Sequence, residues 1–362
     1  MLITTIEELR LSSPAHALDS IDGLVGFIDN SEHDFLEEKL GTPLYDALCR
    51  WYDANPITRS TVADYQTGYY NRLLLLCQRC VAFDALGRAA GMQAVSVNNS
   101  GINQMTADDY KTADKDSVET YRQTCQKEAH AALNQLLRQL EQWCQEEGTT
   151  DSTEETDGTD GSVLSDSVAE RKEIITLWHQ SAYYYLAAAL LIPSCQVLQQ
   201  YLNIYDSREK FIQMLPDLRF IQEEQVAPAI GEPLMLAVID YARDGKVPSD
   251  ATEGLEPVLI RLVHRLCKVM AALLVGRTSV IKYTKEQKIQ AHDDGVRMLQ
   301  NVVEYLRQHQ HDFSEALVRD ADWYVAQPAP APADAPADQP HHCGCDAHDP
   351  ANRAACWTPP LM

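Results

Sequence analysis

The chain has 362 residues, of which 45% are hydrophobic, so its length allows two or three domains with substantial apolar cores. It carries 53 acidic against 30 basic residues, which gives a formal net charge of −23. That balance argues against a nucleic-acid-binding groove, because affinity for phosphate depends on clustered lysine and arginine. Ten cysteines are too few for a disulfide scaffold of this length, so reduced thiols are expected.

Targeting and membrane signals are weak in this sequence. The chain opens without the basic flank and apolar core of a secretory signal. Its most apolar run, residues 182–192, has about half the length that spans a bilayer. We therefore expect a soluble, intracellular protein.

The first 145 residues show helical periodicity almost throughout. Thr5 and Glu8 have the spacing of a capping box and predict a short helix at the start of the chain. Apolar residues then keep helical spacing up to Gly41, where Gly41, Thr42 and Pro43 indicate a tight corner into a new helix. Further helices are predicted over residues 44–55, 60–90 and 118–144.

The segment from residue 91 to residue 117 breaks this pattern. Two short stretches flank Asn99-Ser100-Gly101 and predict a small β-hairpin near residues 94–105. A loop this long in a helical domain is usually either functional or disordered. From the sequence alone, an interaction loop and an excursion without a role are equally open.

Residues 146–166 hold eight carboxylates and no basic residue. They cannot bury enough apolar surface to fold, which predicts a disordered acidic linker. The linker separates a first helical unit, residues 1–145, from a second, residues 167–310. Helices in the second unit are predicted over 167–191, 207–230, 233–244, 253–275 and 283–308, followed by a terminal helix over 311–326 and a Pro/Ala linker with a Cys/His-rich tail over 327–362.

The corner at Gly41 recurs in the second unit, where Ile230-Gly231-Glu232-Pro233-Leu234 matches Leu40-Gly41-Thr42-Pro43-Leu44. Four elements in one order favour an internal duplication over the alternative, a chance similarity of amphipathic helices. We therefore predict a mostly α fold of two duplicated helical bundles. The other matches are Phe27-Ile28 with Phe220-Ile221 at a spacing to the glycine shorter by three residues, Arg79-Cys80 and Ala85-Leu86 with Leu266-Cys267 and Ala272-Leu273, and Leu133, Leu136, Leu137 and Leu140 with Leu299, Val302, Val303 and Leu306.

Catalytic motifs are missing from the sequence. It contains no P-loop, dinucleotide-binding, nucleophile-elbow or HExxH pattern, and no histidine follows a glutamate by the three residues that a di-iron bundle requires. Cys77-Gln78-Arg79-Cys80 lies inside a helical run and indicates core packing rather than a redox or zinc site. We predict a protein that is not an enzyme. A site assembled from scattered residues stays open as an alternative.

The C-terminal tail is the one metal candidate. Cys343, Cys345, His348 and Cys356 offer enough thiolate and imidazole ligands for one tetrahedral zinc ion. Their spacing matches no standard zinc finger, and such a site would gain order only from the metal. An unstructured, reduced tail is the favoured interpretation, and zinc is the alternative.

The N-terminal patterns resemble a known family. Met1–Leu9 gives a short helix, and Leu24–Glu32 and Phe35–Gly41 form a helix ending in Leu-Gly. Together they resemble the head–tail connector (neck adaptor) proteins of tailed bacteriophages, which begin T-x-E-E-L and continue L-x-x-x-I-x-x-A-x-x-x-I-x-x-x-L-G. Residues 211–234 resemble this pattern more distantly. The chain is also similar to an uncharacterised structural family of phages and prophages of gut bacteria.

The resemblance covers residues 1–145 well and residues 170–308 loosely. Ordinary connectors have a single repeat and are shorter, and they contain neither the acidic linker nor the Cys/His tail. Because of these departures, the resemblance specifies neither the ring stoichiometry nor the interface positions, and no interface residue is carried over from the family. The family has no catalytic residues.

The resemblance implies a structural virion protein that joins a ring beneath the portal and bridges it to the tail. The implied partners are further copies of the chain, the portal protein, and tail or other neck proteins, with no sequence-specific nucleic acid and no membrane. The implied location is the virion neck, and the bacterial host cytoplasm before assembly. An acidic lumen would repel passing DNA, and residues 91–117 are our candidate for reaching a neighbour. The alternative function is a cytoplasmic helical scaffold or regulator whose tail binds zinc.

Overall fold

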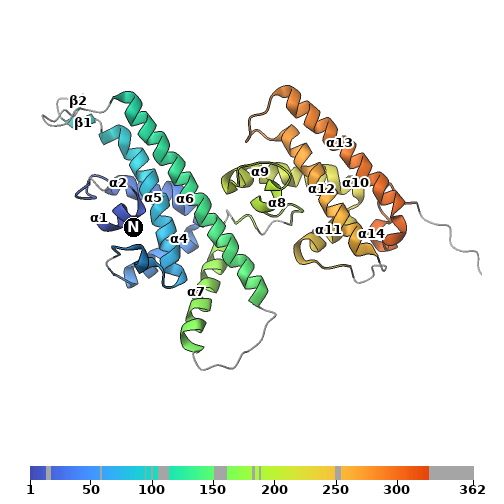
Figure 1. Cartoon of the computed structure of the whole chain (residues 1–362), viewed down its shortest axis with the longest axis horizontal. Helices are drawn as coiled ribbons and strands as arrows, with labels where there is room; N and C mark the ends of the chain where they lie inside the picture. The colour runs from blue at the N-terminus through green and yellow to red at the C-terminus, as the bar shows by residue number, and fades with distance from the viewer. Residues whose placement is uncertain are drawn as a thin grey trace, which may run out of the picture. The chain divides into compact units, whose positions relative to one another are not determined.

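The regular secondary structure of the described residues is helical except for one two-stranded sheet (Figure 1), which confirms the predicted mostly α fold. Residues 1–323 form one compact unit. None of the described helices combines the length and the apolar composition that crossing a membrane requires. The computed structural model describes residues 1–13, 18–57, 59–93, 95–98, 101–104, 114–150, 161–181, 184–186, 189–248 and 254–325.

Two matched series of elements follow one another along the chain. The first comprises α1 Ile6–Ser12, α2 Val25–Ser31, the π-helix η1 Glu32–Glu37, α3 Glu38–Leu40, α4 Thr42–Ala54, the 3-10 helix η2 Val62–Tyr65, α5 Tyr69–Gln93, α6 Lys115–Thr150 and α7 Gly161–His179. The second comprises α8 Cys195–Gln199, α9 Arg208–Ile221, the π-helix η3 Gln222–Val226, α10 Ala227–Ile230, α11 Glu232–Asp244, α12 Leu255–Arg277, α13 Lys285–Gln308, the 3-10 helix η4 Gln310–Asp312 and α14 Glu315–Val318.

The two series have the same order and the same local conformations, as the predicted duplication requires. In each, a helix passes into a π-helix, then a last helical turn, a glycine and a new helix, followed by a long antiparallel pair (α5 with α6, and α12 with α13). Buried apolar residues match at a constant spacing of 190 residues. These pairs are Leu24 with Met214, Ile28 with Leu218, Leu36 with Val226, Leu40 with Ile230, Leu44 with Leu234, and Leu48 with Val238.

One predicted match is wrong. The sequence pattern paired Phe27-Ile28 with Phe220-Ile221 at a shortened spacing, but both π-helices begin nine residues before the corner glycine, so the spacing is equal. Ile28 therefore corresponds to Leu218, and both are fully buried. Phe220 lies 38% exposed beneath the guanidinium of Arg277 rather than in the core.

The boundary between the repeats also differs from the prediction. Helix α6 continues to Thr150 and α7 begins at Gly161, so both helices enter the predicted linker 146–166, and residues 151–160 lie outside the described residues. Helix α7 packs against α4, α5 and α6, and Arg171 pairs with Glu146 at 2.9 Å. The acidic segment thus lies inside the first repeat, and the second repeat begins near residue 189.

Two predicted helices are shorter than expected. The helix expected to reach residue 191 ends at His179, because the chain turns at Ser181 and residues 189–192 then run without helix into the core. The helix expected over 311–326 is reduced to η4 and α14. Phe313 has extended backbone that separates these two turns, and Trp323 is drawn onto the corner, where its indole N–H donates to the Ile230 carbonyl at 3.0 Å.

The predicted hairpin is confirmed. Strands β1 Val95–Asn98 and β2 Gly101–Gln104 pair antiparallel, with Val95 opposite Gln104 and Asn98 opposite Gly101. Figure 1 shows the hairpin beyond the end of α5, on the path from α5 to α6. The second repeat connects its long helices by residues 278–284 alone, so the insertion belongs to one repeat.

Candidate functional site

The glycine corner is the feature that both repeats build most alike. Gly41 has φ +82° and ψ 143°, and Gly231 has φ +99° and ψ 131°, a region of backbone conformation that L-residues rarely adopt. Pro43 and Pro233 then occupy the first turn of the following helix, where a missing backbone N–H costs nothing. The two glycines therefore allow an abrupt change of helix direction that other residues would make at the expense of strain.

The π-helix before each corner begins with a buried polar side chain. Glu32 accepts the backbone N–H of Leu2 at 2.6 Å and the hydroxyl of Tyr45 at 2.8 Å. Gln222, at the matching position, accepts the N–H of Leu191 at 2.8 Å and donates to the Ala189 carbonyl at 2.9 Å. Each side chain thus holds the extended segment that opens its repeat. A π-helical turn often marks a functional position, and here it turns this side chain inward.

A segment remote in sequence closes the back of each corner. A Cβ placed on Gly41 would lie 2.6 Å from the Cβ of Ser181, and one placed on Gly231 would lie 3.1 Å from the Cβ of Ala321. In both segments the backbone N–H bonds to the carbonyl three residues earlier, from Ser181 to Trp178 and from Ala321 to Val318. At Gly41 a larger residue would clash with Ser181, whereas at Gly231 the Ala321 side chain would have to give way by a few tenths of an ångström.

The first corner forms a groove of about 470 Å³ whose charges are compensated locally. Glu37 accepts from the Thr42 hydroxyl at 2.8 Å and lies 2.7 Å from Nδ1 of His33, and Glu38 lies 3.1 Å from Lys39. The hydrogen bond from His33, followed by that from Thr42, lowers the pKa of Glu37. The same contact with Glu37 raises the pKa of His33.

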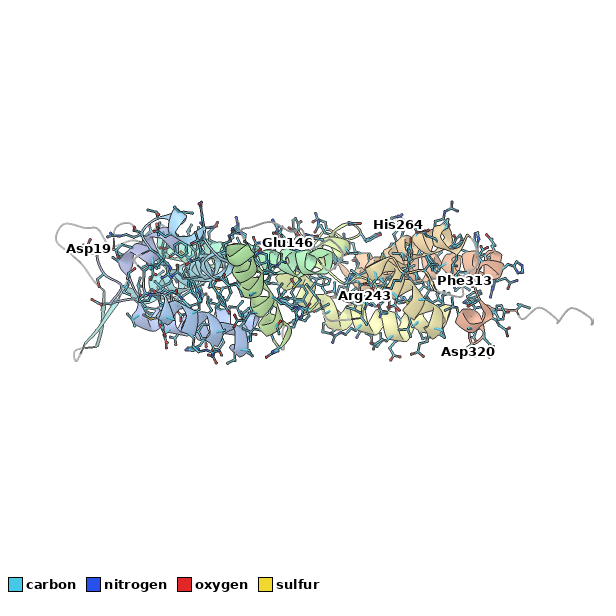
Figure 2. All side chains as sticks on the ribbon, turned by 90° about the horizontal axis from the view of Figure 1, so that it is seen from below. Asp19, Glu146, Arg243, His264, Phe313 and Asp320 are labelled. Atoms are coloured by element: carbon cyan, nitrogen blue, oxygen red, sulfur yellow. The ribbon has the colours of Figure 1, made fainter. Side chains whose placement is uncertain are left out.

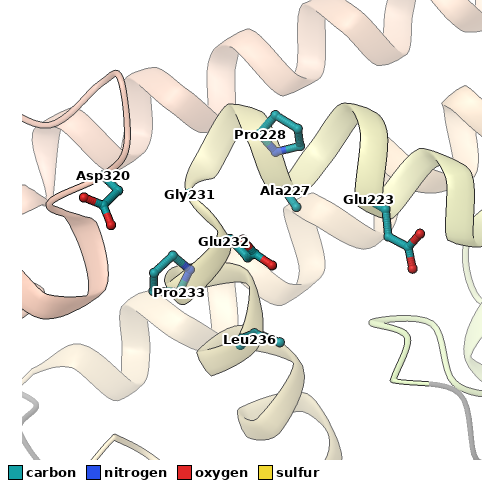
Figure 3. A pocket seen from close by; sticks show the side chains of 8 residues that line it. All are labelled: Glu223, Ala227, Pro228, Gly231, Glu232, Pro233, Leu236 and Asp320. Carbon is teal, nitrogen blue, oxygen red and sulfur yellow. The ribbon is translucent and has the colours of Figure 1, made fainter.

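The second corner forms a groove of about 580 Å³ with a different charge pattern. Figure 3 shows the carboxylates of Glu223, Glu232 and Asp320 around it, each supplied by a different element. In the described structure these three side chains form neither ion pairs nor hydrogen bonds with other side chains. Its apolar part includes Leu236, which is 56% exposed.

The two grooves occupy equivalent positions and have diverged in charge. Glu223 stands where the first groove has His33, Glu232 where it has Thr42, and Asp320 where it has Gln180. Among the eight residues drawn around the second groove, all of them described, there is no hydroxyl, thiol or imidazole group. An arrangement of three uncompensated carboxylates beside an apolar wall suits binding of a cationic side chain rather than nucleophilic catalysis.

A buried ionic cluster fixes the two repeats together. Arg208, at the start of α9, is fully buried, and its Nη2 lies 2.8 Å from Oε2 of Glu141 on α6. Glu141 also accepts the hydroxyl of Tyr185. The side chain of Asn134 accepts the backbone N–H of Arg208 at 2.9 Å, and His130 Nδ1 lies 2.7 Å from Oε2 of Glu209. One face of α6 thus holds the first turn of α9 in place.

The predicted cysteine assignment in α5 is confirmed as core packing. Cys77 and Cys80 are both fully buried, and burial raises the pKa of each thiol well above its ordinary value. Such thiols stay protonated and unreactive.

The predicted zinc ligands Cys343, Cys345, His348 and Cys356 lie outside the described residues. Within the described ranges, no group of three or more His, Cys, Asp and Glu side chains is placed to hold a metal ion.

The sequence pattern located the corners but missed the grooves. Each groove includes a residue from much later in the chain. Gln180 lines the first groove and follows Gly41 by about 140 residues, and Asp320 lines the second and follows Gly231 by about 90. The constant spacing of 190 residues was the available signal for matching the corners, and it carries no information about which later segment returns to them.

Comparison with known proteins gives one partial match. The model of a family of unknown function, DUF6712, matches residues 36–153, about a third of the chain, which spans the first corner, α4, α5, the hairpin and α6. No curated protein and no solved structure matches. The matched region stops before α7 and before Gln180, the residue after α7 that lines the first groove.

Proposed function

We propose that this chain is a structural virion protein, a head–tail connector that joins a homo-oligomeric ring between the portal and the tail of a tailed phage or prophage. It would act in the virion neck after assembly from the host cytoplasm. Its partners would be its own copies, the portal protein, and tail or other neck proteins, and its role would require no catalysis. The resemblance of residues 1–145 to connector proteins supplies the idea, and the following features support it.

The β1–β2 hairpin is the observation that carries the proposal. Both repeats have a long helical pair after the corner, but the connections within these pairs differ, since residues 94–114 join α5 to α6 where residues 278–284 join α12 to α13. The sheet has two strands, so within the described chain the outer edge of each strand lacks a strand partner. An unpaired edge is a template for pairing with another chain, and a ring subunit needs such an extension toward its neighbour.

The rigid junction between the repeats also supports a structural role. Arg208, Glu141 and Tyr185 are buried together where α6 meets α9, so the two repeats behave as one block within residues 1–323. A connector transmits load between portal and tail, and a buried ion pair between its halves resists their separation because breaking it strands a charge. The net charge of −23 would make a lumen formed by this chain repel DNA.

The test is assembly with a portal protein from the same genome. Mass photometry of the chain alone and with the portal, followed by electron microscopy of large species, should show a closed ring of this chain on the portal. The matched variant replaces residues 94–114 with the seven-residue loop 278–284, which already joins two such helices in the second repeat. We expect this variant to keep its helical circular dichroism and thermal transition and to lose assembly.

Two results would contradict the proposal. A wild-type chain that neither forms a ring nor binds the portal would remove the connector function. A loop-swapped chain that assembles on the portal as well as the wild type would remove the hairpin from the interface, leaving the proposal without the observation that carries it.

A further inference from the structure

An uncompensated basic surface runs along α12 in this acidic protein. Arg261, Arg265 and Lys268 are exposed and spaced by four and three residues, which places them on one face of the helix. In the described structure none of the three forms an ion pair, although cations elsewhere, such as Arg277, do. We call these three residues the α12 basic stripe.

The stripe borders a shallow groove with an apolar floor. Arg265 and Lys268 line it together with Met298, Asn301 and Val302 of α13, and its volume is about 310 Å³. Arg265 is held in position by stacking over the ring of Tyr305, with its Cζ 4.0 Å from the ring centroid. The ring of Tyr305 thus positions Arg265 at the groove, where Lys268 also lies.

An exposed apolar side chain lies on α12 near the stripe. Ile260 comes one residue before Arg261, about 100° away around the helix, and is 54% exposed. In the first repeat the helix that corresponds to α12 is α5, and the 19-residue α7 packs against α4, α5 and α6. The counterpart of α7 is α14, which has four residues and a length of about 6 Å. Within the described residues, the second repeat therefore has no helix as long as α7 at the position of α14.

We infer that the α12 basic stripe is a self-association surface, and that its occupant is the acidic groove at the Gly231 corner of a second copy of this chain. The groove offers three carboxylates without cationic partners, from Glu223, Glu232 and Asp320, and the stripe offers three cations without anionic partners. Leu236 in the groove is the apolar counterpart of Ile260 beside the stripe. Charge and apolar character are thus complementary between the two surfaces.

The two surfaces lie on different sides of the second repeat. Figure 2 shows His264, on the outer face of α12, and Asp320, on the groove, at opposite edges of this repeat. Two different patches on one subunit make a heterologous, head-to-tail contact, which generates a ring when the rotation closes. The first corner cannot serve equally, because His33 and Lys39 already compensate its carboxylates.

The ring that this contact would build belongs to the proposed function, on which the inference rests. The contact itself is measured as self-association of the chain in the absence of the portal protein. If the chain self-associates through the stripe but does not bind the portal, the connector function is wrong and the inferred interface stands. If the chain binds the portal but its self-association does not depend on the stripe, the connector function stands and the inferred interface is wrong.

The test uses charge reversal on each side of the contact in the full chain. Arg261→Glu/Lys268→Glu and, separately, Glu223→Lys/Asp320→Lys should each raise the dissociation constant of self-association by more than about tenfold in sedimentation velocity, because attraction becomes repulsion. Glu232 is left unchanged, since it opens α11 and favours the helix N-terminus. The matched control, Arg297→Glu/Arg307→Glu, changes the net charge equally on α13 and should leave association unaltered.

Restoration of the contact separates the interface from a folding defect. Mixing the two reversed chains should recover oligomers. The acidic stripe of the Arg261→Glu/Lys268→Glu chain attracts the basic groove of the Glu223→Lys/Asp320→Lys chain, and the unchanged acidic groove of the former attracts the unchanged basic stripe of the latter. Wild-type association should weaken at about 0.5 M salt, where exposed charges are screened.

Three results would overturn the inference. A wild-type chain that stays monomeric up to about 100 μM at low salt has no contact of even weak affinity. Loss of association in the α13 control equal to that in the stripe variant would show a net-charge effect. Binding of duplex DNA that the stripe variant loses, with self-association unchanged, would assign the stripe to nucleic acid instead.

Discussion

Replacing Arg208 with methionine is expected to lower the free energy of unfolding by about 3–5 kcal/mol, the usual cost of removing one partner of a buried pair. The Arg208 side chain is 0% exposed, and its Nε and Nη2 lie 2.9 and 2.8 Å from Oε2 of Glu141, which is itself 3% exposed. Without the guanidinium, the Glu141 carboxylate stays inside the protein with the hydroxyl of Tyr185 but without a cation.

The double variant Glu141→Leu/Arg208→Met should cost clearly less than the sum of the two single variants, because it leaves no buried charge behind. Urea unfolding followed by circular dichroism and tryptophan fluorescence measures each value, provided that the two probes coincide. The surface control is Arg297→Met, whose pair with Asp294 is 70% exposed on the arginine side and should contribute less than about 1 kcal/mol. A loss below about 1 kcal/mol for Arg208→Met, or additive costs in the double variant, would refute the account of this junction.

Three further outcomes are expected. Gly41→Ala should lower the melting temperature more than Gly231→Ala, because both substitutions meet backbone strain of about 1–3 kcal/mol but the new Cβ at Gly41 would face the neighbouring side chain at 2.6 Å rather than 3.1 Å; equal losses in a thermal scan would contradict this. The hydrogen bond that the His130 ring donates to the Glu209 carboxylate raises the pKa of His130, so the stabilisation from this pair is complete below the unfolded pKa of about 6.5 and is lost as the pH rises through the higher folded pKa; an NMR titration in which Glu209→Gln leaves the His130 pKa unchanged would count against it. Cys77 should resist alkylation in the native chain and react after unfolding, as mass spectrometry will show, because burial both raises its pKa and blocks access; rapid native labelling would be inconsistent with the core.

The helical class, the corners and the hairpin follow from local sequence. Gly41 and Pro43 indicate the first corner through their backbone preferences, and the Asn99-Ser100-Gly101 signal in the sequence predicted the strands β1 and β2 that form. Such signals act over a few residues, so one sequence contains them completely.

The repeat boundary could not be found in this way. Carboxylate density between residues 146 and 166 predicted a linker, but α6 continues to Thr150 because packing against α7 and the Arg171–Glu146 pair extend it. Similarly, periodicity extended α7 to residue 191, whereas the contact of Ser181 with Gly41 ends it early. Tertiary contacts override local preference at both places.

The grooves and the stripe lie beyond local inference for a related reason. Asp320 joins Glu223 and Glu232 through the fold, and the cations of α12 matter because no described acid reaches them, which a sequence pattern does not reveal. The net charge of −23 is a sum over the whole chain, so it does not show that three cations lie together on α12.

The most direct test of the central claim is mass photometry of the purified chain mixed with the portal protein of its own genome. We expect a single large species whose mass equals the portal ring plus a ring of this chain, resolved as a collar beneath the portal by electron microscopy. A mixture in which the portal and a monomeric chain remain separate at all ratios would contradict it.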